Sequence, residues 1–304
     1  MSVSKKDKFQ SLKIFLRTFL LFISLVLLVG FKCSYPFYQI NENNQERLSE
    51  VLKKTGEYCK KVKRMALFYV CKENVVGKIY FYRKKDIIKR FEKLETDSGQ
   101  KNKELKEKRK KTFTYDYQLV KKEEELREKR VLLEEDGKEK YEENAVLWVV
   151  KYVGKYLVFG PVGFLSKYWQ NYFNYEIVGK DTVEGKDAII IKSSPKEIRE
   201  ENNNFGKIWV DEKDFSILKI EWDPLSIKDF VGEKIQTPGG DLRETVTWNV
   251  IYGVEKNGVR FPSKQLIQEV FVNEKGQKVI KEETIIIYKD YQFFIVEVDV
   301  KYKR

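Results

Sequence analysis

Histidine is absent from this sequence of 304 residues. It is the commonest general base and a frequent zinc ligand, so its absence excludes Ser-His-Asp and Cys-His catalysis and the usual imidazole metal sites. Cysteine is also scarce: there are three, with no C-x-x-C pair for redox chemistry. The carboxylate pairs Glu134/Glu135 and Asp211/Asp214 fall at predicted turns, where such groups are usually solvated. We therefore expect neither an enzyme nor a bound metal or cofactor.

Apolar residues, in contrast, are plentiful. Hydrophobic residues make up 42% of the chain and aromatic residues 14%, which is too much for a disordered protein. The formal net charge is +12, of which residues 1–34 contribute +5 and residues 84–111 contribute +6, so the rest is nearly neutral. A nucleic-acid binder would place basic and aromatic residues together on one ordered face. This charge distribution argues against nucleic acid as a partner.

The N-terminal segment has the composition of an export signal. Cationic residues within positions 1–14 precede an uninterrupted apolar run from Thr18 to Phe31. The run has the length of a secretory h-region and is short for a bilayer span, which needs about 20 residues. No A-x-A site follows it, so residues 1–34 are predicted to be either a signal peptide or a retained N-terminal anchor that uses residues 15–31. The mature chain is expected in the periplasm or cell envelope, attached to the inner membrane in the second case.

Two cysteines are predicted to lie close together. Cys59 falls on the apolar stripe of a helix predicted for residues 43–64, and Cys71 lies in the apolar run that follows. In an oxidising compartment, a disulfide between Cys59 and Cys71 would stabilise the fold by about 2–3 kcal/mol. Two buried free thiols are the alternative.

After the helix, the hydrophobic period becomes that of strands. Strands are predicted at 65–72 and 75–82, followed by a charged insertion, 84–111, interpreted as a solvated loop or an exposed helix. Residues 112–119 alternate between apolar and polar, which predicts a half-buried strand. The apolar stretch 145–173 is divided by a Gly-Pro pair into a strand-like half and a short helix.

The remaining strands are predicted to form antiparallel hairpins. Asp136-Gly137, Glu184-Gly185 and Asn257-Gly258 are hairpin turn signals between alternating segments. A final strand is predicted at 291–302, and its alternation leaves one face of the sheet in water. Residues 35–304 are therefore predicted to form a single β-rich domain.

Parts of this pattern resemble the outer-membrane lipoprotein-sorting superfamily, which includes the periplasmic carrier and receptor of lipoproteins and the sigma-factor regulatory protein. The resemblance lies in the order of one helix and many strands, in YEIVGKDTVEGKDAIIIKSSP and GKIWVDEKDFSILKIEWDP within Tyr175–Pro224, and in NGVRFPSK at Asn257–Lys264. It implies an α+β, mostly β fold. The sheet would be a strongly curved antiparallel half-barrel, with an N-terminal helix and short helices over the concave face. It also implies that the hollow holds lipid acyl chains or lipidated proteins.

The leading hypothesis is therefore an exported cell-envelope protein that binds a lipid or lipidated protein in this hollow. The candidate ligand-binding residues alternate onto apolar faces of predicted strands: Phe113, Tyr115, Tyr117, Trp248, Val250 and Tyr252. Ordinary core packing is the alternative explanation for each of them. The alternative function is a membrane-tethered sensor or scaffold domain that binds a protein partner. The sequence does not predict an oligomeric state.

Overall fold

The computed structural model describes residues 35–66, 68–96, 106–122, 125–147, 156–197, 205–227, 234–237 and 240–294. It divides into two compact units, residues 1–50 and 51–304. The described part of the first unit is the first half of helix α2 (Tyr35–Met65). All other elements belong to the second unit. The predicted signal peptide or anchor, residues 1–34, lies outside the described residues.

Strands make up most of the second unit. The first six strands are β1 (Tyr69–Ile79), β2 (Arg109–Lys122), β3 (Glu125–Glu135), β4 (Lys138–Glu143), β5 (Phe173–Val183) and β6 (Lys186–Pro195). The following strands are β7 (Gly206–Asp211), β8 (Ile217–Trp222), β9 (Lys234–Thr237), β10 (Gly240–Ile251), β11 (Val254–Lys256), β12 (Val259–Phe261), β13 (Lys264–Asn273) and β14 (Lys278–Phe293). The short helical segments are α3 (Lys84–Thr96), η1 (Leu157–Phe159), α4 (Gly160–Leu165), η2 (Trp169–Asn171) and η3 (Pro224–Ser226).

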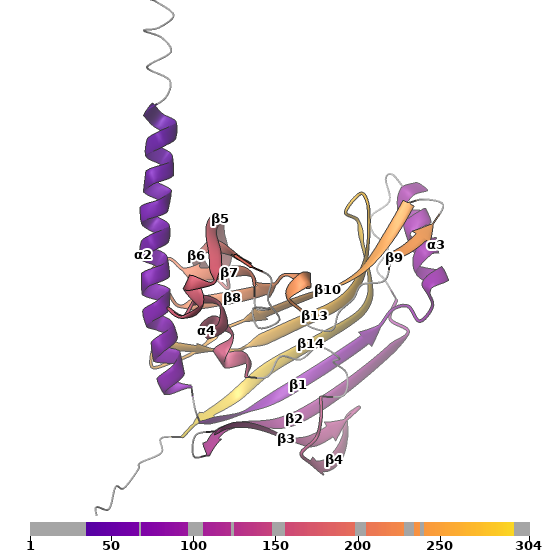
Figure 1. Ribbon diagram of the computed structural model, residues 1–304. Coiled ribbons are helices and arrows are strands. Elements are labelled where there is room, and N and C mark those ends of the chain that lie inside the picture. The colour runs from indigo at the N-terminus through magenta and orange to yellow at the C-terminus, as the bar shows by residue number, and fades with distance from the viewer. Residues whose placement is uncertain are drawn as a thin grey trace, which may run out of the picture. The chain divides into compact units, whose positions relative to one another are not determined.

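One antiparallel sheet contains twelve of these strands, in the order β4-β3-β2-β1-β14-β13-β10-β8-β7-β6-β5, with β9 beside β10. The end strands β4 and β5 do not pair with each other, so the sheet is open. Figure 1 shows that it bends strongly, with β5–β8 rising at one end and β9 at the other. Strands β11 and β12 form a separate hairpin. The predicted fold class, a mostly β, strongly curved antiparallel sheet, is confirmed.

The predicted hairpin turns form where the sequence places them. Asp136-Gly137 joins β3 to β4, Glu184-Gly185 joins β5 to β6, and Asn257-Gly258 joins β11 to β12. Both residues of each turn have positive φ, between 48° and 79°. Such turns match the right-handed twist of the strands, and glycine adopts the second position without strain. Local turn chemistry therefore sets the register of these three hairpins.

Two strand predictions were wrong in detail. The region predicted as two strands is one continuous strand, β1, which pairs with β14 on one side and β2 on the other. The polar pair Glu73-Asn74 was interpreted as a break, but in the structure it lies within the ladder. At the C-terminus, residues 291–293 are the end of β14 instead of the start of a new strand. The rest of that predicted strand, beyond residue 294, lies outside the described residues.

The charged insertion is only partly solvated. Its first half is helix α3, whose side chains Ile87 and Phe91 are buried against Leu242, Phe271 and Val279 at the far end of the sheet. Burying such side chains contributes roughly 1.5–3 kcal/mol each. Residues 97–105 lie outside the described residues, and the last residues of the insertion begin β2. The apolar residues of this helix recur with a helical period, but the many lysines between them favoured the prediction of a solvated segment.

Candidate functional site

The candidate site is the face of the sheet that carries the six predicted lining residues, which we call the inner face. In an antiparallel pair, directly opposite residues project to the same side. One row of such pairs crosses β10, β13, β14, β1 and β2 through Val250, Gln265, Ile286, Val75 and Phe113. The predicted residues of β2 and β10 therefore share this face, with three strands between the two groups.

All six predicted residues are buried, and none exposes more than 7% of its surface. Tyr252 is enclosed by the helical segments: its hydroxyl donates to the Leu157 carbonyl at 2.9 Å, and Gly160 approaches it closely. This position matches the alternative of ordinary core packing. Trp248 stacks on Trp222, with ring centres 4.2 Å apart. Trp222 was not among the lining residues predicted from the sequence.

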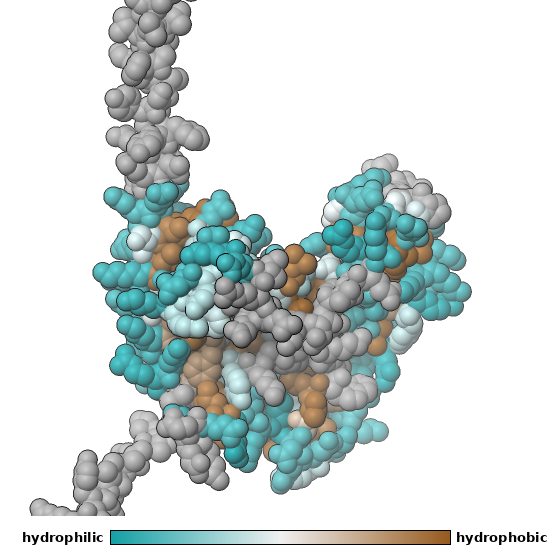
Figure 2. Space-filling model, in the orientation of Figure 1, coloured by the Kyte–Doolittle hydropathy of each residue, from teal (hydrophilic) through white to brown (hydrophobic). Residues whose placement is uncertain are grey.

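The helical segments cover the inner face unevenly. In the described part of the chain, α4, η1 and η2 pack near β5 and β8, and α3 packs at the far end of β14. Phe113 and Tyr115 on β2 are also buried, with 5% and 1% of their surface exposed. Figure 2 shows some hydrophobic residues at the surface between the β5–β8 end and the β9–α3 end of the domain. A ligand that reached the buried side chains would replace contacts they already make.

A strip of polar side chains crosses this apolar face. We call it the polar strip, and it consists of Gln265, Tyr288, Glu73, Arg130 and Glu128. It runs diagonally over β13, β14, β1 and β3, because Tyr288 is directly opposite Glu73 and Arg130 reaches Glu73 across β2. The strip passes between the two predicted groups of lining residues.

An ion pair forms the centre of the polar strip. Arg130 donates from Nε and Nη2 to the two carboxylate oxygens of Glu73, at 2.6 and 3.0 Å, and Glu73 is 0% exposed. Arg130 also lies 3.8 Å from Glu128 and 4.8 Å from the ring centre of Tyr117. Glu128 accepts hydrogen bonds from the Tyr117 hydroxyl and the Tyr156 backbone N–H. When all three charged groups are ionised, two carboxylates face one guanidinium and the strip carries a net charge of −1.

Burial dominates the titration of this pair. It raises the pKa of Glu73, and the charge and hydrogen bonds of Arg130 oppose that rise only in part. The Tyr288 hydroxyl lies close enough to Glu73 to lower its pKa slightly, although it makes no hydrogen bond of ordinary geometry. Burial alone would lower the pKa of Arg130, but Glu73 raises it, so the guanidinium stays charged. The Arg130 guanidinium is therefore already paired with carboxylates of the protein itself, Glu73 and Glu128.

A second buried arginine lies in the NGVRFPSK segment. Arg260, on β12, is 2% exposed, and its Nε donates to the Ser216 hydroxyl at 2.6 Å. Its Nη2 lies 3.4 Å from Glu255 and 3.7 Å from both Asp211 and Asp214. Burial would raise the pKa of Asp214, but hydrogen bonds from Ser216 and the charge of Arg260 lower it overall. The predicted turn carboxylates Asp211 and Asp214 thus hold a structural arginine.

The other carboxylate pair is also engaged. Glu134 accepts a hydrogen bond from the Thr114 hydroxyl, and Glu135 pairs with Lys111 and Lys140. No group of His, Cys, Asp and Glu among the described residues is arranged to hold a metal ion. None of the helices in the described ranges combines the length and apolarity that crossing a membrane requires.

The predicted disulfide does not form in the structure. Cys59 and Cys71 are both buried free thiols, which is the alternative that the sequence left open. The Cys59 thiol donates to the Pro161 carbonyl at 3.3 Å, so it points into α4. Cys71 lies on the inner face of β1, opposite Tyr117. Burial raises the pKa of Cys59 to about 12 and raises that of Cys71 as well, so both remain protonated and poorly reactive.

Three residues of this site were not predicted from the sequence: Glu73, Arg130 and Gln265. A signal for Glu73 was present, because strand alternation places it on the same side as Cys71 and Val75. Nothing local indicated its partner, since Arg130 is 57 residues away. Strand alternation likewise places Gln265 on the inner face, opposite Val250 and Ile286. A single glutamine in a strand does not, however, indicate a binding site by itself.

Among known proteins, the chain is similar to several solved structures. No family model and no curated protein matches the chain. A LolA superfamily protein from Nitrosomonas europaea matches at 9% identity and a TM-score of 0.36, covering 81% of this chain and 94% of that one. A DUF1329 family protein from Desulfovibrio piger matches at 11% identity and a TM-score of 0.34, covering 82% and 95%. The MucA/MucB complex of Pseudomonas aeruginosa matches at 8% identity and a TM-score of 0.21, covering 82% and 99%.

All three TM-scores are below 0.5. The function proposed below therefore depends on the chain's own residues.

Proposed function

We propose that this protein is an exported cell-envelope protein that binds a lipid acyl chain, free or on a lipidated protein, on the inner face of its open sheet. The observation that carries the proposal is a curved, single-layer sheet with aromatic and aliphatic side chains on its concave side. The six candidate residues lie on that side and are buried, so an acyl chain bound there would replace side-chain contacts that they already make. The export-like composition of residues 1–34 supports the location, and the tethered form remains the alternative.

The size of the hydrophobic effect is sufficient for reversible binding. Apolar surface removed from water contributes about 25 cal/mol per Å², so an acyl chain that buries about 300 Å² gains several kcal/mol. Ordering the chain and replacing existing side-chain contacts reduce this gain. The net affinity suits a protein that holds a lipid and releases it again.

The stacked pair Trp222 and Trp248 provides an internal reporter of binding. Bromine quenches tryptophan fluorescence at short range, so an acyl chain brominated near its middle should quench this pair when it enters the inner face. We expect saturable quenching of the wild-type protein. It should be largely lost in the double variant Trp222→Phe, Trp248→Phe, which keeps an aromatic ring at both positions.

Trp209→Phe is the matched control. Trp209 lies on the opposite face of the sheet, beside Ala188 and Leu218, where its Nε1 donates to Asp181. Quenching in this variant should equal that of the wild type. The proposal is wrong if no saturable quenching occurs and organic extracts of the purified protein contain no lipid.

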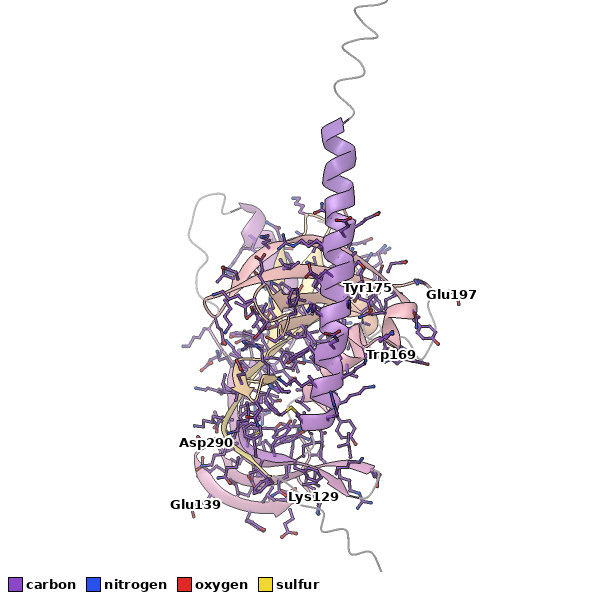
Figure 3. The ribbon with its side chains drawn as sticks, turned by 90° about the vertical axis from the view of Figure 1, so that its left-hand side faces the viewer. Lys129, Glu139, Trp169, Tyr175, Glu197 and Asp290 are labelled. Carbon is purple, nitrogen blue, oxygen red and sulfur yellow. The ribbon has the colours of Figure 1, made fainter. Side chains whose placement is uncertain are left out.

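The alternative function, binding of a protein partner, is favoured by a different surface. Tyr168, Trp169 and Tyr172 form an aromatic group just before the edge strand β5, and Tyr168 is 60% exposed. Figure 3 shows Trp169 close to Tyr175 and on the other side of the domain from Glu139 of β4. Exposed tyrosine and tryptophan are enriched in protein interfaces.

Photo-crosslinking in cells separates the two functions. A crosslinking amino acid at Tyr168 should yield a discrete protein adduct if this surface binds a partner. The same group at Tyr141, which is 72% exposed on the opposite edge strand, is the control. Equal, diffuse adducts at both positions would mean that this surface binds no specific protein, and they would favour lipid binding as the function.

A further inference from the structure

Gln265 is a buried amide with one half unused. It lies on β13 in the inner face and is 0% exposed. Its Oε1 accepts a hydrogen bond from Trp248 Nε1 at 3.1 Å. An indole N–H can only donate, so this contact fixes which end of the amide faces Trp248. The Nε2 group has no hydrogen-bond partner in the part of the chain that the structure describes.

The surroundings of Nε2 make this absence costly. Gln265 is directly opposite Val250 on β10 and Ile286 on β14, and both are fully buried apolar residues. An amide donor that is removed from water and left unpaired is destabilising, so such groups usually have a partner. An apolar side chain at this position would avoid the cost. A ligand that brings a hydrogen-bond acceptor would satisfy the donor.

The charges nearby restrict what that acceptor can be. The polar strip carries two carboxylates, Glu73 and Glu128, and its one cation, Arg130, is already bonded to Glu73 through two nitrogens. A ligand carboxylate or phosphate would therefore find no free cation in the polar strip, and burying its charge there without a partner would be costly. A neutral oxygen fits better.

We propose that Gln265 Nε2 donates a hydrogen bond to the carbonyl oxygen of an acyl ester or amide whose hydrocarbon chain lies on the inner face. This inference rests on the proposed function and adds to it the chemical class of the ligand. Gln265 would act as a specificity-determining residue that distinguishes an acyl carbonyl from plain hydrocarbon and from a free fatty acid. A buried donor that must otherwise stay unpaired discriminates between such ligands more sharply than apolar contact does.

The test measures binding of four brominated probes to the purified full chain by tryptophan quenching. The probes share an eighteen-carbon chain and differ at the end: a methyl ester, an N-methylamide, the free acid and the hydrocarbon. For Gln265→Leu we expect roughly tenfold weaker binding of the ester and of the amide, and unchanged or tighter binding of the hydrocarbon. For the wild type at neutral pH, the free acid should bind more weakly than the ester. The two carbonyl probes show whether esters and amides are both accepted.

Two further variants keep the result interpretable. Trp248→Phe removes the indole donor but leaves Gln265 Nε2 in place, so it should retain the preference for the ester over the hydrocarbon. Gln265→Met is nearly the same size as glutamine and lacks the donor, so it should repeat the result of Gln265→Leu if the latter folds poorly. The midpoint of urea unfolding shows whether each variant is folded.

The outcomes separate this inference from the function on which it depends. If no probe binds to the wild type, the proposed function itself fails. If the probes bind but Gln265→Leu and Gln265→Met weaken all four equally, or none, Gln265 has only a packing role and the inference is wrong. Tighter binding of the free acid than of the ester would also overturn it.

Discussion

Replacing Arg130 with methionine is expected to cost about 3–5 kcal/mol of the free energy of unfolding near neutral pH. The substitution keeps an apolar stem of similar length but leaves the Glu73 carboxylate 0% exposed and without its bidentate partner. An uncompensated buried charge is among the most destabilising changes a protein can undergo. Urea unfolding followed by circular dichroism measures the loss.

The loss should depend on pH. Burial already raises the pKa of Glu73, and removing Arg130 removes the largest influence that lowers it. A carboxyl whose pKa is higher in the folded state than in the unfolded state binds its proton more tightly when folded, so its folded form gains stability as pH falls. The gap between wild type and Arg130→Met should therefore shrink between about pH 8 and about pH 5.

Two controls identify the cause. Arg127 lies on the same strand and pairs with Glu125, but both side chains are at least half exposed, so Arg127→Met should cost less than about 1 kcal/mol. The double variant Glu73→Leu, Arg130→Met removes both charges and should recover most of the stability, because replacing a buried ion pair by apolar residues is often neutral. A single variant as stable as the wild type at about pH 8 would contradict a buried, ionised pair.

The second large effect is expected at Arg260. This side chain is 2% exposed and joins β12 to the β7–β8 turn, where it meets Ser216, Asp211 and Asp214. Arg260→Met should cost about 3–5 kcal/mol. Asp211, which is 3% exposed, would retain Lys186, at 3.9 Å, as its only cationic neighbour among the described residues. The shift in the urea unfolding midpoint measures the loss.

Lys256→Met, on the same β11–β12 hairpin but exposed, is the matched control and should change stability by less than about 0.5 kcal/mol. Adding Asp211→Asn to Arg260→Met should restore part of the loss, since the amide carries no charge to leave unpaired. An equal, small effect of both single variants would mean that these carboxylates are solvated and that Arg260 does not hold the hairpin in place.

Much of the fold was predictable because its determinants are local. The turns at Asp136-Gly137, Glu184-Gly185 and Asn257-Gly258 carry their own conformational preference, and alternation assigned Phe113, Tyr115 and Tyr117 to one side of a strand. Errors arose where a polar residue has a partner far along the chain. Glu73 was interpreted as a break in a strand for this reason, although it is satisfied by Arg130.

The site was less predictable than the fold. Strand alternation identified buried inner-face residues such as Trp248 and Val250, but it could not show that the Tyr252 hydroxyl is bonded to η1. Nor could it pair the two cysteines correctly, because Cys59 and Cys71 point into different parts of the core. The ligand-binding role of the six candidate inner-face residues remains a prediction.

The amino-acid sequence alone determined the three hairpin turns, most of the strands and the alternation that places apolar residues on the inner face, because each depends on residues within a few positions of one another. The tertiary structure decided which strands lie side by side, and hence that Gln265, Tyr288, Glu73 and Arg130 meet in one polar strip. These residues are up to 215 positions apart in the sequence. Their charges and hydrogen-bonding groups interact strongly only because the folded sheet buries them together, away from water.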